Sequence, residues 1–175
     1  MRKFFAGFAL GVAFLPILGV IAARLGLWPV RATANPPAWE HRLAASALRA
    51  SLSRDAARVV SPIPSSDENL LAGLKLYRNG CAGCHGDFGH PSPWGTTAFY
   101  PRVPQFAGEP SSLTPPEMYL VVKRGIRYSG MGAWGALLSD EDIWRVVSFV
   151  SRVRALPPSV DAAWEGTARA GSSGP

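Results

Sequence analysis

Cys81, Cys84 and His85 are the residues whose types and spacing most directly indicate chemistry in this chain. Two thiols three positions apart can each form a thioether with one vinyl group of a single haem. The histidine directly after the second cysteine is then held against the haem iron, for which a neutral imidazole is a good ligand. This spacing is the sequence signature of c-type haem attachment. It predicts one covalently bound haem c per chain, held by Cys81, Cys84 and His85.

Other uses of the same residues are less well supported. Cys81 and Cys84 are the only 2 cysteines of the chain, which excludes a framework of structural disulfides. A redox-active cysteine pair is expected near a βαβ unit, and no such pattern is present. A zinc site needs four ligands, whereas Cys81, Cys84 and His85 offer three. Haem attachment is therefore the favoured interpretation.

The iron of such a haem has a second axial position, and four side chains are candidates for it: Met131, Met118, His90 and His41. Met118 falls on the apolar face of a predicted helix, where a core role is favoured. His90 follows His85 too closely to reach the opposite side of the haem with ease. Met131 lies between two glycines that let the backbone approach the porphyrin closely. A thioether is also the usual partner of histidine in electron-transferring haems, so we predict that His85 and Met131 ligate the iron.

Three short helices are predicted to position these residues. Ser65 and Glu68 read as a capping box that opens a helix ending at Gly80, directly before Cys81. Thr114 and Glu117 form a second capping box, with Pro115 at the favoured first position and Gly125 as the stop. Ser139 and Asp142 open a final helix that ends before Pro157. No strand-period segment of useful length is present, so the predicted fold class is all-α, with short helices and long loops around a cofactor.

Residues 86–113 form a long predicted loop that is rich in Gly, Pro, Ser and Thr. A loop of this length counts against a compact fold unless something fills its centre, and a haem would do so. Four aromatic residues are scattered through the loop and are expected to line a porphyrin edge: Trp94, Phe99, Tyr100 and Phe106.

Residues 4–23 carry no charge and are flanked by Arg2, Lys3 and Arg24. A helix of this length spans the hydrocarbon core of a bilayer, which is roughly 30 Å thick. We therefore predict a membrane anchor over residues 1–24. The alternative is a cleaved signal peptide, although its apolar region is usually shorter and the small-residue site at residues 32–34 lies far beyond the run.

The remaining organisation follows from composition. Residues 25–64 are predicted to be a linker that contains a basic amphipathic helix over residues 38–60, lying either on anionic lipid or a partner, or on the domain itself. Residues 65–158 form the predicted haem domain. Residues 159–175 are rich in Ala, Gly, Ser and Pro and are predicted to be a disordered tail. The formal net charge of +6 resides in residues 1–65, so no basic face for nucleic acid is expected on the domain.

The sequence resembles the class I c-type cytochromes, and especially their membrane-anchored bacterial members with one haem. The resemblance covers about residues 66–156. It rests on the haem motif of residues 81–86, on Gly73, Tyr77 and Cys81 spaced by four, and on residues 125–131, which are similar to the axial methionine loop of the family. It implies a cytochrome c-like fold in which Gly73 lets the last helix cross closely, at Ile143, Trp144 and Val147.

The same resemblance implies further details of the site. A proline carbonyl should contact the proximal imidazole, and Pro91, Pro93, Pro101 and Pro104 are all possible. The family often has proline directly after the axial methionine, where this chain has Gly132. Haem attachment of this kind takes place outside the bacterial cytoplasm. This implies an inner-membrane protein with its haem domain in the periplasm, or a soluble periplasmic protein if the N-terminal segment is cleaved.

Electron transfer is the function these features favour. Iron held by His85 and Met131 would stay six-coordinate, leaving no open substrate site, so we expect an electron carrier and not an enzyme. Its partners would be redox proteins in or at the membrane, with residues 4–23 in the lipid bilayer, and it could be the cytochrome subunit of a larger oxidoreductase. The alternative is a haem sensor or haem enzyme with a displaceable sixth ligand, which only Gly132 supports.

Overall fold

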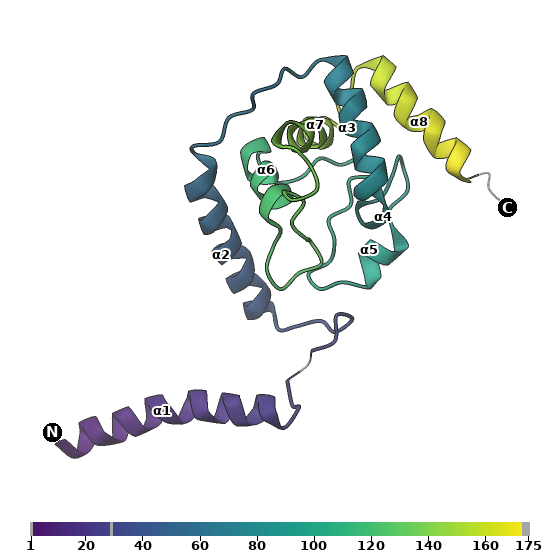
Figure 1. The fold of residues 1–175 in the computed structure, drawn as a ribbon. Coiled ribbons are helices and arrows are strands. Elements are labelled where there is room, and N and C mark those ends of the chain that lie inside the picture. Colours follow the sequence, from purple (N-terminus) through teal and green to yellow (C-terminus); the bar gives the residue numbers. More distant parts are fainter. Residues whose placement is uncertain (1, 29, 173–175) are drawn as a thin grey trace.

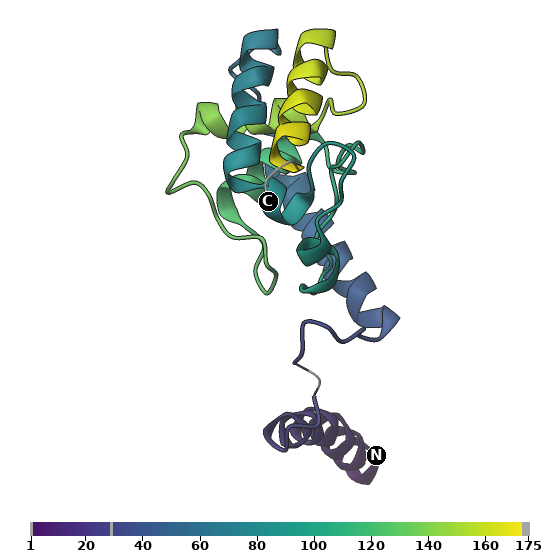
Figure 2. The same cartoon turned by 90° about the vertical axis from the view of Figure 1, so that its right-hand side faces the viewer.

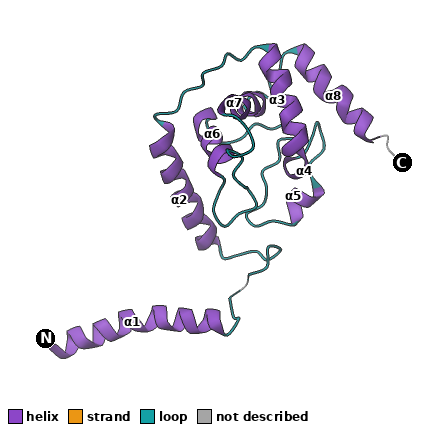
Figure 3. Ribbon diagram, viewed as in Figure 1, coloured by secondary structure: helices purple, strands orange, loops and turns teal. Residues whose placement is uncertain are grey.

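The computed structural model describes residues 2–28 and 30–172, and every regular element in these ranges is a helix (Figures 1 and 3). Apart from the helices, an isolated bridge pairs Asp87 with His90. The predicted all-α class is confirmed for the described residues. The helices are α1 (Arg2–Arg24), α2 (Ala38–Ala56), α3 (Asp67–Gly80), α4 (Ala82–His85), α5 (Pro93–Thr97), α6 (Pro115–Arg124), α7 (Asp140–Val150) and α8 (Pro158–Ser172).

The N-terminal helix α1 contains the uncharged run of residues 4–23 and lies apart from the other helices (Figure 2). Among the described residues, no helix combines the length and the apolar character needed to cross a membrane. The membrane anchor predicted from the sequence covers residues 1–24. Part of that prediction, namely Met1 and the side chains of residues 2–6 and 8–10, lies outside what the structure describes.

The basic helix α2 packs against α6 through its second half. Leu52 is buried, and Asp55 forms an ion pair with Arg124 of α6. Trp39 and Leu43, at the start of α2, are 55% and 63% exposed. Of the two interpretations of this helix, the structure shows packing on the domain.

The crossing of α3 and α7 forms the centre of the core (Figure 1). A Cβ atom at Gly73 of α3 would lie 2.1 Å from the backbone oxygen of Arg145 and 3.1 Å from Cβ of Phe149. Only glycine therefore permits this approach, and the close crossing predicted at Gly73 is present. The atoms nearest to Gly73 belong to Arg145 and Phe149, however, and not to the residues named from the sequence. Around the crossing, the side chains of Leu70, Ile143, Val147 and Phe149 are at most 2% exposed.

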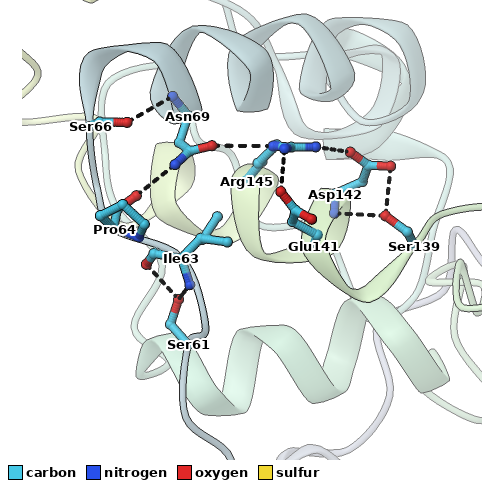
Figure 4. A network of polar contacts seen from close by, with 9 residues as sticks. All are labelled: Ser61, Ile63, Pro64, Ser66, Asn69, Ser139, Glu141, Asp142 and Arg145. Atoms are coloured by element: carbon cyan, nitrogen blue, oxygen red, sulfur yellow. Dashed lines mark hydrogen bonds and ion pairs between the residues drawn. The ribbon is translucent and has the colours of Figure 1, made fainter.

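A polar network joins the same two helices at the surface (Figure 4). The Arg145 guanidinium donates to Oδ1 of Asn69 at 3.3 Å and to Oδ1 of Asp142 at 2.7 Å, and it also pairs with Glu141. The Asn69 side chain in turn donates to the backbone oxygen of Pro64 at 3.0 Å. The amide of Asn69 thus links the segment before α3 to α7.

The helix starts agree with the predicted caps at two of three positions. Thr114 and Glu117 form the predicted capping box, with the Thr114 N–H donating to the Glu117 carboxylate at 2.9 Å. Ser139 caps α7 by accepting from the Asp142 N–H at 3.1 Å. At α3 the cap is Ser66 and not Ser65, because Oγ of Ser66 accepts from the Asn69 N–H at 3.3 Å.

The C-terminal segment differs from the prediction of a disordered tail over residues 159–175. Residues Pro158–Ser172 form α8, which lies beside α3 in both views (Figures 1 and 2). Val160 and Trp164 are buried, at 0% and 1% exposure, and Trp164 packs edge-on against Phe149 and Phe88. These two large side chains supply the apolar contact that the surrounding small residues lack. Residues 173–175 lie outside the described part of the chain.

Candidate functional site

Cys81 lies at the junction between α3 and α4. Its N–H donates to the Tyr77 oxygen of α3 at 2.7 Å, while its own oxygen accepts from the N–H of His85 at 2.9 Å. Cys81, Cys84 and His85 therefore share one helical turn placed directly on the end of α3. Both cysteines are free and half-buried.

The Cys81 thiol is unlike the reactive thiol of a redox-active pair. Burial, and secondarily the neighbouring Cys84, raises the pKa of Cys81 to about 11. A reactive cysteine instead has a lowered pKa in an exposed, electropositive setting. Within the described residues, no group of three or more His, Cys, Asp or Glu side chains could hold a metal ion, so a zinc site also lacks its ligands. A half-buried pair suits thioether bonds, which leave no thiol to ionise.

His85 has one ring nitrogen engaged by the backbone. Its Nδ1 lies 2.8 Å from the backbone oxygen of Pro104, and its ring stacks on Phe106 with centroids 4.8 Å apart. A carbonyl oxygen can only accept, so Nδ1 carries the proton and Nε2 is the atom left to ligate a metal. Burial lowers the pKa of His85, and the hydrogen bond to Pro104 only partly opposes this shift. The lowered pKa favours the neutral imidazole. Of the four prolines considered from the sequence, the structure places Pro104 at this position.

The backbone oxygens of the motif are held by residues from four other positions. The buried hydroxyl of Tyr77 donates one of these bonds, to the Gly86 oxygen. Burial raises the pKa of this hydroxyl far above its usual range, so it stays protonated and remains a donor. Sequence reasoning missed Ser92 and Gln105, because single polar residues in a loop carry no local signal. The four bonds are Ser92 Oγ to Gly83 O at 2.6 Å, Gln105 Nε2 to Cys84 O at 3.0 Å, Phe106 N to His85 O at 2.7 Å and Tyr77 Oη to Gly86 O at 2.6 Å.

Met131 is half-buried in the loop that connects α6 to α7. Its N–H donates to Oγ of Ser129 at 3.1 Å, and its oxygen accepts from the Ile126 N–H at 2.9 Å. A Cβ atom at Gly130 would lie 2.4 Å from the Phe99 ring, so this glycine lets the methionine loop pack on the loop that follows α5. The segment carrying Met131 therefore meets the segment that follows the cysteine motif.

The other three candidates for the sixth position differ from Met131 in their burial. Met118 is 6% exposed in the core on α6, as expected for a core residue. His90 is exposed, and its Nδ1 lies 2.6 Å from the oxygen of Phe88. His41 is on the exposed side of α2. Met118 is thus a core residue, whereas His41 and His90 have exposed side chains.

The aromatic residues expected at a porphyrin edge are divided between two places. Phe106 stacks on His85, whereas Trp94 packs edge-on against Phe99 and is 60% exposed. Trp134 was not singled out from the sequence, yet a Cβ atom at Gly80 would lie 2.7 Å from its ring. The glycine that ends α3 thus brings Trp134 close to the start of the motif.

The cysteine motif lies in a stretch of the chain that matches a known protein family. Residues 68–150 match the family described as cytochrome C oxidase, cbb3-type, subunit III. Comparison with curated proteins gave no match. A solved chain of the reducing HAO-like protein complex of Kuenenia stuttgartiensis is similar at 22% identity and a TM-score of 0.44, over 53% of this chain and 46% of that chain. The match thus spans less than half the length of that solved chain. The family match covers the cysteine motif, Pro104 and Met131 together, and it is consistent with a class I c-type cytochrome over residues 68–150.

Proposed function

We propose that this chain is a one-electron carrier with one haem c, attached through Cys81 and Cys84 and ligated by His85 and Met131. When bound, the haem supplies the iron that accepts and donates the electron. The observation that carries the proposal is the state of His85: Nδ1 donates to the Pro104 oxygen at 2.8 Å, which leaves Nε2 for the iron.

The surroundings of His85 support a fixed ligand. The Pro104 oxygen and the Phe106 ring restrain the imidazole on two sides. A carbonyl that accepts from Nδ1 also makes the imidazole a more basic ligand. The residues of the motif would therefore hold one geometry while the charge at the site changes.

Met131 is proposed as the second ligand because its loop is anchored close to the motif. The backbone of Met131 forms hydrogen bonds with Ser129 and Ile126, and Gly130 packs closely against the Phe99 ring. At Gly132 a Cβ atom would meet nothing within 4 Å, so this position is open to the proline that the family often carries. A thioether ligand opposite a histidine raises the reduction potential of a haem.

We further propose that the haem domain works outside the cytoplasm and exchanges electrons with redox proteins at the membrane. The matched family is described as a subunit of a cytochrome c oxidase, which supports a role as partner or cytochrome subunit of a larger oxidoreductase. Fractionation of cells, followed by protease treatment of intact spheroplasts, tests this placement. Protection of the haem domain from added protease would contradict it.

The absorption spectrum of the reduced protein, with and without carbon monoxide, tests the ligation. We expect a haem c spectrum that the gas leaves unchanged, because both axial positions are filled. A ready shift with carbon monoxide would remove Met131 as a firm ligand and would favour a haem sensor or haem enzyme. A protein without haem would refute the proposal as a whole.

A further inference from the structure

We propose that Gln105 is a positioning residue that sets the hydrogen bond between His85 and Pro104 and so tunes the proximal ligand. This inference rests on the proposed function, because it concerns the nitrogen of His85 that faces away from the iron. It is carried by the hydrogen bonds of the Gln105 amide, which join three backbone segments around the motif.

The amide of Gln105 uses both of its ends. Its Nε2 donates to the oxygens of Cys84 at 3.0 Å and Val103 at 2.9 Å, and its Oε1 accepts from the Ser92 N–H at 2.7 Å. Carbonyls only accept and a backbone N–H only donates, so one orientation of the amide satisfies all three partners. The side chain therefore joins the haem motif, the start of α5 and its own loop.

Two glycines enclose this amide. A Cβ atom at Gly95 would lie 3.0 Å from Nε2 of Gln105 and 1.9 Å from the oxygen of Cys84. A Cβ atom at Gly86 would lie 3.1 Å from Oε1 of Gln105. The amide thus sits in a space with no room for further side-chain atoms at these two positions.

The consequence concerns Pro104, the residue directly before Gln105. The oxygen of Pro104 can meet Nδ1 of His85 only if the loop keeps its register along α4. That register is fixed by two bonds from the residues directly after Pro104: the Gln105 side chain donates to the Cys84 oxygen, and the Phe106 N–H donates to the His85 oxygen. Loss of the amide should loosen the Pro104 contact, make the imidazole less basic and destabilise the oxidised iron, which raises the reduction potential.

The test is the substitution Gln105→Met, which keeps the length of the side chain and removes its donors and acceptor. Exchange of the His85 Nδ1 proton with deuterium is followed by NMR in the reduced haem protein, and the reduction potential is measured by spectroelectrochemistry. We expect exchange about tenfold faster than in the wild type, the loss that corresponds to one hydrogen bond, together with a raised potential. If this variant fails to mature, Gln105→Asn is used, because its shorter side chain cannot span Cys84 and Ser92 together.

Asn69→Leu provides the matched control. Its amide also bridges two segments, from Pro64 to Arg145, but far along α3 from the motif. The inference is overturned if the Gln105 variants leave proton exchange and potential unchanged, or if Asn69→Leu changes both equally, because the effect would then be general loosening of the fold. A wild-type protein that carries no haem c, or that keeps its iron spectrum when His85 is replaced, would instead refute the proposed function.

Discussion

Replacing Gly73 with alanine tests the central crossing of the fold. The new Cβ atom would lie 2.1 Å from the Arg145 oxygen, a backbone atom on a helix that cannot turn aside. Relief requires α7 to move away from α3 by about 1 Å, and a gap of that size forfeits a quarter to a half of the dispersion attraction across it. Overpacking of this kind costs about 3 kcal/mol. The better helix propensity of alanine returns about 1 kcal/mol, so the expected net loss of unfolding free energy is about 2 kcal/mol.

Guanidinium and thermal unfolding of the haem-loaded protein measure this loss. For the haem domain of residues 65–158, a loss of about 2 kcal/mol of stability corresponds to a fall in Tm of roughly 8–16 °C. Gly166→Ala is the matched control, because it changes a helical glycine of α8 whose Cβ would meet nothing within 4 Å. We expect that control to be neutral or slightly more stable than the wild type. If Gly73→Ala matched the control in stability, with the same dependence on denaturant, the reasoning about the crossing would be refuted.

Further substitutions test ligation, packing and charge separately. Met131→Ala should let the reduced haem bind carbon monoxide and should lower its reduction potential. Met118→Ala, in the core, should cost about 2–5 kcal/mol of stability and leave the absorption spectrum unchanged. The reverse pattern would mean that Met118 is the iron ligand and Met131 a packing residue. Trp164→Ala should destabilise the protein by about 3–5 kcal/mol, since the ring is buried against Phe88 and Phe149. A loss of stability as small as that caused by Trp94→Ala, at an exposed tryptophan, would mean that the packing of α8 contributes little to stability. Ser139→Ala should cost about 1 kcal/mol near pH 7 through the lost cap. The hydrogen bond from Ser139, and secondarily the one from Arg145, lowers the pKa of Asp142. A carboxyl group whose pKa is lowered by folding stabilises the fold at a pH above its unfolded pKa, and this stabilisation is lost as the pH falls through the folded pKa. Denaturant titrations near pH 7 and at about pH 2 should therefore show a smaller cost of Ser139→Ala in acid, and a constant cost would contradict this account.

Local chemistry explains why much of the helical frame could be predicted. The capping box of Thr114 and Glu117 and the cap at Ser139 each involve residues three positions apart, so their partners are visible in the sequence. The same holds for the haem motif, in which Cys81, Cys84 and His85 share one turn. At α3 two adjacent serines compete, and the choice of Ser66 depends on which one meets the Asn69 N–H.

The parts that could not be predicted depend on residues far apart in the chain. Nothing local distinguishes Pro104 from the other prolines, since its role arises only when its loop lies along α4. The role of Gln105 could not be predicted either, because its bonds to Cys84 and Ser92 form only when these segments meet in the fold. The composition around α8 suggested disorder, because two buried anchors, Val160 and Trp164, are diluted among small and polar residues. Composition averages a segment, whereas packing depends on individual side chains.

The docking of α8 has a consequence for the order of folding. Arg78, near the end of α3, pairs with Asp87 and donates to the Trp164 oxygen, a hydrogen bond between residues 86 positions apart. Contacts of such sequence separation form late, because a long stretch of chain must first be closed. The ribosome also makes α8 well after Cys81 and Cys84. If haem is attached as proposed, the cysteine motif would therefore be accessible for that attachment before α8 packs beside Asp87.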